Sequence, residues 1–182
     1  FLATIRLATL AKKMKIKRFI FSSSQSMYGI SKKKEELDEN NSQKSPVTEY
    51  AKTKWLAEQK LIDLADENFL VCCFRPSTVF GFSPRLRLDI VYNNLVASAF
   101  AMNKIEILSD GSPWRPVVHV QDVASAFIAG ICAPENLLNK QSYNVGIHNG
   151  NYTIRELANN VKNIHQSSNI AFINQHTDSR SY

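Results

Sequence analysis

The sequence predicts an α/β fold built around a parallel sheet. Two short apolar runs, Arg18–Phe21 and Phe69–Phe74, carry this prediction. Both are rich in aromatic or β-branched residues and alternate with helical segments, which is the pattern of parallel strands buried on both faces. Each run ends in a polar cluster, Ser22–Gly29 in one case and Arg75–Gly81 in the other. Because ligands bind beyond the carboxyl ends of such strands, we expect the site there.

The first elements follow from periodicity. Helical spacing over Leu2–Met14 leads into a strand over Arg18–Ser22. The next segment, Ile30–Lys44, is polar and rich in lysine and acidic residues, so it predicts a solvated loop.

A second helix is predicted after Thr48, which is well placed as its N-cap, and runs to about Asp66. We expect its apolar stripe to face the sheet or a partner subunit; the stripe consists of Ala51, Trp55, Ile62 and Ala65. After the strand Phe69–Phe74, Pro76 is expected to interrupt ladder pairing.

The C-terminal half continues the alternation of helices and strands. Asp122 is expected to cap a helix over Val123–Cys132, and Thr153 with Glu156 forms a capping box that opens a helix ending near Ile164. The remaining predicted elements are a loop over Phe82–Arg87, a helix over Asp89–Met102, a turn at Asp110–Gly111, and strands over Ile105–Leu108, Val117–Val120 and Tyr143–Gly146.

Tyr50 and Lys54 are spaced for proton transfer. Residues four apart on a helix project from the same face, and an ammonium group favours the phenolate over the phenol. An unperturbed tyrosine has a pKa of about 10, so a nearby cation helps it act as a general acid/base. Taken alone, the spacing also fits a tyrosine ring packed against a lysine stem, and the surrounding motifs must decide between the two interpretations.

Composition is that of a cytoplasmic protein without a membrane span. The chain is 44% hydrophobic, yet no apolar run approaches the roughly 20 residues of a span. Arg6 interrupts the apolar stretch Leu2–Leu10, which argues against a signal peptide. The adjacent Cys72 and Cys73 should point to opposite faces of a strand as reduced thiols. No His, Cys or carboxylate cluster has the spacing of metal ligands, so no metal site is expected.

The net charge of +6 is unevenly distributed. Residues 1–34 hold nine of the 22 basic residues and no acid. A basic patch can bind nucleic acid or an anionic surface. The cations at Lys12–Arg18, however, fall where a helix ends and a strand begins, and cations stabilise a helix C-terminus. We therefore expect no nucleic-acid or membrane partner.

Several segments resemble one family in order and spacing, and they span nearly the whole chain. They are Phe19–Ser24 with Tyr28–Gly29, Ser45–Lys54, Phe74–Gly81, Ser83–Arg85 and Gly111–Ala124. The chain thereby resembles the extended short-chain dehydrogenase/reductase family of NAD-dependent nucleotide-sugar epimerases and dehydratases.

The resemblance implies two interwoven domains. Residues 1–76, with 143–146 returning to the same sheet, would form the C-terminal part of an NAD-binding domain of Rossmann type, a doubly wound parallel sheet. Most of 77–182 would form a smaller α/β substrate-binding domain, truncated at its C-terminus. The glycines at 29, 81, 111, 130, 146 and 150 provide no G-x-G-x-x-G turn. We therefore interpret the chain as a fragment whose cofactor pyrophosphate site lay on preceding residues.

The resemblance also assigns catalytic and cofactor-binding roles. Ser24 would hydrogen-bond the reacting sugar oxygen, and Tyr50 would exchange its proton. Lys54 would hold the cofactor ribose and keep the tyrosine pKa low, helped by the cationic nicotinamide. The cofactor would also contact Tyr50, Ser22, Ser23 and Pro76. The structural alternative for Ser24 is a strand-end serine that satisfies backbone groups.

Substrate binding is expected from a second set of residues, which the family places near the sugar diphosphate. Arg115 fits this role because a guanidinium binds phosphate oxygens bidentately. Thr78 stands where many members have asparagine. Asn94 matches the family's diphosphate asparagine, although Asn93 beside it fits the register equally well. Arg180 is a further candidate phosphate ligand.

The two residues after Ser24 select the reaction. Dehydratases of the family carry Asp-Glu there, because elimination of water needs an additional acid and base. This chain has Gln25 and Ser26, which disfavours dehydration. The prediction is therefore an NAD-dependent nucleotide-sugar epimerase, and the resemblance implies that it forms a homodimer. A keto-sugar reductase with the same Ser, Tyr and Lys is the alternative, and a non-catalytic dinucleotide- or RNA-binding protein is the alternative from another class.

Overall fold

The computed structural model describes residues 1–30 and 37–173 and divides them into two units. The first unit combines Phe1–Ser77 with Asp122–Val145. The second combines Thr78–Gln121 with the described residues from Gly146 onward. The chain therefore leaves the first unit after Ser77 and returns to it at Asp122.

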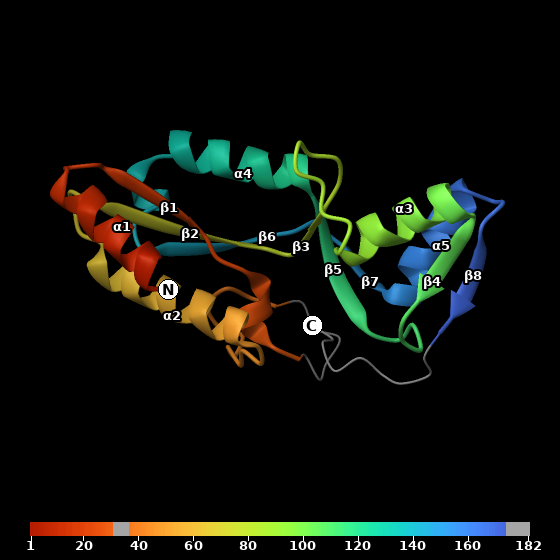
Figure 1. Ribbon diagram of the computed structural model, residues 1–182. Coiled ribbons are helices and arrows are strands. Elements are labelled where there is room, and N and C mark those ends of the chain that lie inside the picture. The colour runs from red at the N-terminus through yellow and green to blue at the C-terminus, as the bar shows by residue number, and fades with distance from the viewer. Residues whose placement is uncertain (31–36, 174–182) are drawn as a thin grey trace. The chain divides into compact units, whose positions relative to one another are not determined.

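A parallel three-stranded sheet forms the centre of the first unit (Figure 1). Its strands are β1 (Arg18–Ser22), β2 (Leu70–Pro76) and β6 (Gln141–Val145), in the order β1-β2-β6. Arg18 pairs with Leu70 and Cys72 with Gln141. The carboxyl ends of all three strands therefore meet at one edge, which confirms the parallel sheet and the returning strand predicted from the sequence.

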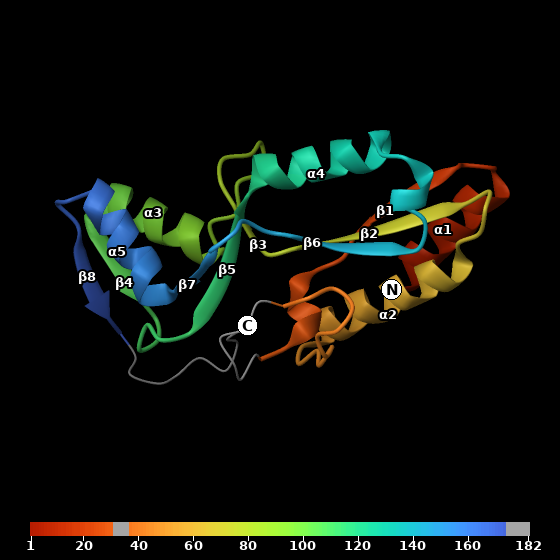
Figure 2. The ribbon, with the colours of Figure 1, turned by 180° about the vertical axis from the view of Figure 1, so that it is seen from behind.

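Helices cover both faces of this sheet, as Figures 1 and 2 show from opposite sides. Helices α1 (Leu2–Lys13) and α2 (Glu49–Leu64) cover one face, and α4 (Val120–Cys132) covers the other. Val71 and Cys73 of β2 pack into a core with Ala8 and Leu61, whereas the Phe74 ring contacts Phe127 of α4. Burial on both faces explains why β2 is apolar from Leu70 to Phe74.

The adjacent cysteines of β2 are free and buried. Burial raises the pKa of Cys72 to about 11 and raises that of Cys73 further. A thiol with a raised pKa holds little thiolate at neutral pH, so both behave as packed hydrophobic residues.

Helix α2 begins as predicted, and Ala51 and Ala65 of the predicted stripe are buried. Thr48 is its N-cap, with Oγ1 accepting from Ala51 N at 3.1 Å. Trp55 is only half-buried, although the apolar pattern assigned it to the stripe. The side chains that are fully buried on α2 are those of Ala51, Ala57, Glu58 and Leu61. A carboxylate therefore lies inside the stripe, where periodicity expects an apolar side chain.

Pro76 ends β2 without interrupting its pairing, contrary to the prediction. It is paired with Val145, and Ser77 N donates to Val145 O at 2.9 Å. Successive amides of a strand point to opposite sides, so the missing N–H of Pro76 falls on the side of β1. Strand β1 has already ended there, because its last residue, Ser22, pairs with Phe74.

The second unit contains two small sheets (Figure 1). Strands β3 (Thr78–Phe80), β5 (Trp114–His119) and β7 (Asn151–Thr153) form one, in which β5 and β7 are antiparallel. Strands β4 (Lys104–Ile107) and β8 (Asn169–Phe172) form the other, which is parallel. Helices α3 (Val91–Met102) and α5 (Ile154–Ile164) supply Leu95, Leu157 and Val161 to the core of this unit.

The capping box at α5 is confirmed, and the predicted cap of α4 is wrong. Thr153 Oγ1 accepts from Glu156 N at 3.2 Å while Glu156 Oε2 accepts from Thr153 N at 2.7 Å. Helix α4 instead starts at Val120, so Asp122 lies in its first turn. Here His119 Nδ1 accepts from Gln121 N at 3.3 Å, and the histidine satisfies an amide that a capping carboxylate would otherwise bind.

Candidate active site

The serine cluster lies at the carboxyl end of β1. Ser24 is the N-cap of the short 3-10 helix η1 (Gln25–Tyr28). Its Oγ accepts from Ser26 N at 3.2 Å and lies 2.9 Å from Ser26 Oγ. Ser23 is buried, and its amide donates to Phe74 O at 2.6 Å. The hydroxyl of Ser24 is therefore fixed at the edge where the sequence predicts the site.

Lys54 connects helix α2 to this strand end. Its Nζ donates to Ser22 O at 2.7 Å and lies 4.9 Å from the Phe21 ring centroid. The same ammonium is 5.8 Å from the centroid of the Tyr50 ring. Burial lowers the pKa of Lys54. The side chain is half-buried, so its ammonium is partly shielded from water and interacts more strongly with groups beside it than a fully exposed one would.

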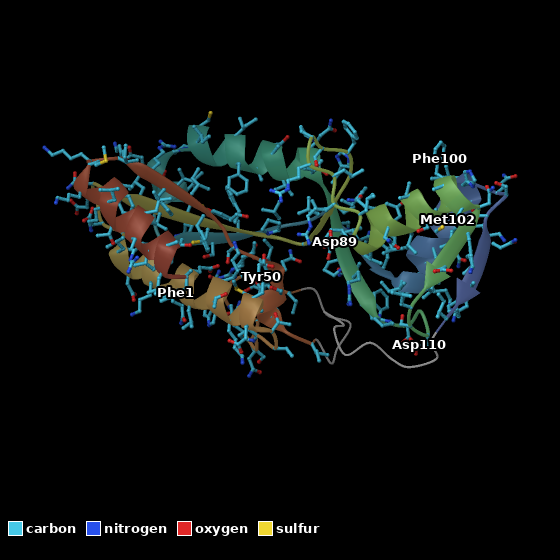
Figure 3. All side chains as sticks on the ribbon, in the orientation of Figure 1. Phe1, Tyr50, Asp89, Phe100, Met102 and Asp110 are labelled. Carbon is cyan, nitrogen blue, oxygen red and sulfur yellow. The ribbon has the colours of Figure 1, made fainter. Side chains whose placement is uncertain are left out.

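Tyr50 lies in the first turn of α2, and 57% of its surface is exposed (Figure 3). Lys54 follows one turn later on the same face, as the spacing predicts. Within the first unit, the structure therefore places Lys54 against Ser22 at the end of β1, with the Tyr50 ring near the same ammonium. An exposed phenol near a partly buried ammonium can exchange a proton with a ligand at this edge.

Buried hydroxyl groups mark the ends of two neighbouring strands. Ser23 follows β1, and Ser77 follows Pro76 at the end of β2. Among the residues that the structure describes, no hydrogen-bond partner is found for Ser23 Oγ or Ser77 Oγ. An unpaired buried polar atom is costly. Both hydroxyls are thus available to a polar ligand at the carboxyl edge of the sheet, beside the buried Pro76.

Apart from Ser24, the predicted substrate-binding residues that the structure describes lie in the second unit. Thr78 begins β3, and its buried Oγ1 has no partner within residues 1–30 and 37–173. Arg115 is 9% exposed on β5 and donates from Nη1 to Trp114 O at 2.7 Å. Arg180 lies outside the described residues.

The two asparagines of α3 differ in environment. Asn93 accepts from Gly81 N at 3.0 Å and donates to Arg87 O at 2.9 Å, so it holds the loop before the helix with both ends of its amide. Asn94 is exposed and donates from Nδ2 to Leu88 O at 3.1 Å. Asn94 is therefore the more accessible of the two, and its role in substrate binding stays a prediction.

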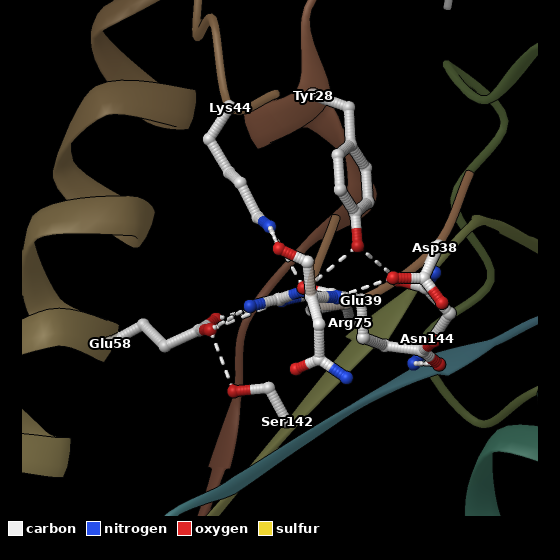
Figure 4. Close-up of polar contacts among 9 residues, drawn as sticks. Tyr28, Asp38, Glu39, Lys44, Glu58, Arg75, Ser142 and Asn144 are labelled. Carbon is white, nitrogen blue, oxygen red and sulfur yellow. Dashed lines mark hydrogen bonds and ion pairs between the residues drawn. The ribbon is translucent and has the colours of Figure 1, made fainter. Parts of the chain in front are cut away.

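A buried ion pair beside this site has no counterpart among the roles predicted from the sequence (Figure 4). Arg75 of β2 binds Glu58 of α2, with side chains that are 4% and 2% exposed. Tyr28 of η1 accepts from Arg75 Nη1 at 2.8 Å. Two signals were available in the sequence: a charged residue at the end of an apolar run, and a carboxylate one turn after Lys54 on the same helix face.

Neither a metal site nor a membrane span is found in the described part of the chain. Within residues 1–30 and 37–173, His, Cys, Asp and Glu side chains form no cluster suited to a metal ion. The helices in those ranges are too short or too polar to cross a membrane.

Known proteins resemble this chain in both sequence and structure. It is 29% identical over 180 residues to a UDP-glucose 4-epimerase of Bacillus subtilis (strain 168), covering 85% of this chain and 50% of the relative. It is 26% identical over 185 residues to a UDP-glucose 4-epimerase of Caenorhabditis elegans, covering 89% of this chain and 52% of the relative. The chain thus spans about half the length of these relatives.

Solved structures share the fold. A Thermus thermophilus UDP-glucose 4-epimerase in complex with NAD superposes with a TM-score of 0.82 at 20% identity, covering 100% of this chain and 60% of that one. A dTDP-glucose 4,6-dehydratase of Bacillus anthracis str. Ames in complex with NAD gives 0.80 at 21% identity, covering 98% and 56%. The predicted Rossmann-type α/β fold is confirmed by these likenesses.

The family is established by a sequence match over most of the chain. The pattern of the NAD dependent epimerase/dehydratase family matches residues 1–146, which include the serine cluster, Tyr50, Lys54 and Arg75. By this match the chain belongs to the NAD dependent epimerase/dehydratase family.

Proposed function

We propose that this chain carries the proton-transfer half of an enzyme that epimerises a nucleotide-diphosphate sugar through a transient keto-sugar. The observation that supports it most is the bond from Lys54 Nζ to Ser22 O, which holds the Tyr50 helix against the serine-bearing strand end. The similarity to two UDP-glucose 4-epimerases supports the substrate class.

NAD is the cofactor in this proposal, and the residues of the first unit fit it. Ser23 Oγ and Ser77 Oγ are buried polar atoms whose partners the described residues do not supply. Together with Ser22, Pro76 and the ammonium of Lys54, they would hold the ribose and nicotinamide end of the cofactor. When bound, NAD supplies the hydride acceptor and donor for the sugar carbon.

The three catalytic residues together move and orient the proton of the sugar hydroxyl. Tyr50 removes the hydroxyl proton during oxidation and returns it after reduction. Lys54 stabilises the negative charge that develops on the tyrosine oxygen. Ser24 hydrogen-bonds the reacting sugar oxygen and keeps it oriented. The substrate diphosphate would be bound by Arg115, Thr78, Asn94 and Arg180.

Gln25 and Ser26 favour epimerisation over dehydration. Elimination of water needs an acid and a base at the positions after Ser24, and an amide and a hydroxyl supply neither at neutral pH. Ser26 is instead engaged with Ser24, through its amide and its hydroxyl. With NAD bound, the hydride would therefore return to the carbon that lost it, on the other face of the sugar.

The same proposal includes a homodimer and separate binding roles for the two units. Helices α1 and α2 lie side by side in both views of the ribbon. They expose Leu7, Leu10 and Leu56, at 60%, 52% and 48%, a surface suited to a second copy. The first unit would bind the cofactor and the second the nucleotide sugar, in the cytoplasm.

Cofactor stoichiometry tests the reaction class. The full-length protein should convert UDP-glucose, UDP-N-acetylglucosamine or dTDP-glucose to an epimer many times over for each bound NAD, as measured by chromatography of the sugar nucleotides. A keto-sugar reductase would consume one reduced cofactor for each product, and a dehydratase would accumulate a dehydrated keto-sugar. Either result, or binding of NAD without turnover of any of these sugars, would contradict the proposal.

A further inference from the structure

We propose that Arg75 is a positioning residue, whose buried guanidinium sets the helix that carries Tyr50 and Lys54 against the turn that carries Ser24. This inference rests on the proposed function for the roles of those three residues. The geometry that carries it lies entirely within the first unit.

Arg75 donates several hydrogen bonds to Glu58 of α2. The distance from Nε to Oε1 is 3.1 Å, from Nε to Oε2 3.3 Å, and from Nη2 to Oε1 2.5 Å. Ser142 of β6 donates to the same Oε1 at 2.8 Å. The carboxylate is therefore held from two strands of the sheet and has little freedom to move (Figure 4).

Glu58 transmits this constraint along α2. It lies one turn after Lys54 and two turns after Tyr50, so all three share one face of a continuous helix. The Arg75 guanidinium also stacks near Trp55, 5.8 Å from its ring centroid. Because α2 is continuous from Glu49 to Leu64, contacts at Glu58 and Trp55 restrict the position of the whole helix. The ion pair thereby fixes where Tyr50 lies relative to the sheet.

On the other side, Arg75 holds η1. Its Nη1 donates to Tyr28 OH at 2.8 Å and to Glu39 O at 3.0 Å. Tyr28 OH in turn donates to Asn144 Oδ1 at 2.9 Å. Burial raises the pKa of Tyr28, so its phenol remains protonated and can donate. Tyr28 is the last residue of the turn whose N-cap is Ser24.

One guanidinium thus connects the element of Ser24 with the element of Tyr50. The fork of an arginine presents its donors in fixed directions, and a lysine at the same position offers a single point of charge. Buried ion pairs contribute little net stability compared with apolar residues of similar volume. We therefore expect the Arg75–Glu58 pair to affect the position of α2 relative to η1 as well as folding.

The test compares Arg75→Lys with a matched control, Arg18→Lys, in the full-length protein. Arg18 also binds within the first unit, where its Nη1 donates to Ile131 O at 2.6 Å in the last turn of α4 and to Ala133 O at 2.8 Å just after that helix. It contacts neither α2 nor η1 through these bonds. Both variants should lose stability in urea. Only Arg75→Lys should lower kcat, by about 10²-fold, with KM nearly unchanged, because a small misplacement of catalytic groups has that effect.

Tyr28→Phe provides a second variant that keeps the ion pair. It removes the hydroxyl that links Arg75 to η1, and it should lower kcat in the same direction with a smaller loss of stability. Its purpose is to retain a test if Arg75→Lys fails to fold. Wild-type kcat in both Tyr28→Phe and any folded Arg75→Lys protein would overturn the inference.

A fluorine signal separates this inference from the proposed function. With 3-fluorotyrosine incorporated, the resonance of Tyr50 can be assigned by its loss in Tyr50→Phe. It should shift in Arg75→Lys and Tyr28→Phe and stay in place in Arg18→Lys, whichever sugar the enzyme uses. An inactive wild type would refute the proposed function alone, whereas an unshifted Tyr50 resonance in both network variants would refute the positioning role.

Discussion

Tyr50→Phe should lower the rate of hydride transfer by about 10²–10⁴-fold, the usual contribution of a positioned acid or base. The variant loses only the phenolic oxygen, because the exposed ring and its contact with Lys54 remain. Binding of cofactor and sugar should therefore stay close to wild type. The measurement is the rate at which reduced nicotinamide forms after mixing the NAD-loaded full-length enzyme with UDP-glucose.

Tyr143→Phe is the matched control for this prediction. Tyr143 is also a partly exposed tyrosine of the first unit, and its hydroxyl donates to Leu137 O at 2.6 Å. Loss of that bond should change stability slightly and leave the rate of hydride transfer unaltered. A Tyr50→Phe enzyme as fast as the Tyr143→Phe enzyme would exclude Tyr50 as the proton-transfer group.

Glu58→Gln should destabilise the protein by about 3 kcal/mol or more, because it leaves the buried Arg75 charge without its counter-ion. The glutamine has nearly the same shape, so the loss reports charge and hydrogen bonding more than packing. Ser142 also loses its carboxylate acceptor. The free energy of unfolding in urea, followed by circular dichroism, measures the effect.

Glu49→Gln makes the same chemical change on the same helix at an exposed position. Glu49 pairs with Lys52 at 2.7 Å, and its side chain is 83% exposed. Such a surface pair contributes at most about 1 kcal/mol, so this variant should be nearly as stable as wild type. The double variant Glu58→Leu with Arg75→Met should also recover part of the stability lost in Glu58→Gln. Equal stability of the Glu58 and Glu49 variants would contradict the account of the buried pair.

Periodicity and capping residues determine how much of the fold can be predicted. The strand at Arg18–Ser22 and the helix that ends at Ile164 agree with the structure because an apolar run and a capping box define them locally. Strands β3, β7 and β8 were not predicted. They contain three or four residues each, and their pairing with distant segments, which local sequence does not record, makes them strands.

The residues of the candidate site also differ in how far the sequence predicts them. Tyr50, Lys54 and the serines of β1 could be brought together from helix spacing and the common edge of parallel strands. The Arg75–Glu58 pair could not, because hydrophobic patterning places charged residues outside and says nothing about which of them are paired within. Spacing likewise could not separate Asn93 from Asn94, whose difference depends on the fold of the preceding loop.

The fate of the sugar hydrogens tests the central claim most directly. The full-length enzyme is incubated with UDP-glucose in deuterated water, and the epimer is analysed by mass spectrometry. In the proposed reaction the hydride passes from the sugar carbon to NAD and back to that carbon, so we expect an epimer without carbon-bound deuterium. Carbon-bound deuterium in the product would instead show that a C–H proton exchanges with solvent, as elimination of water requires. That result would contradict a transient oxidation of the sugar assisted by Tyr50 and Lys54.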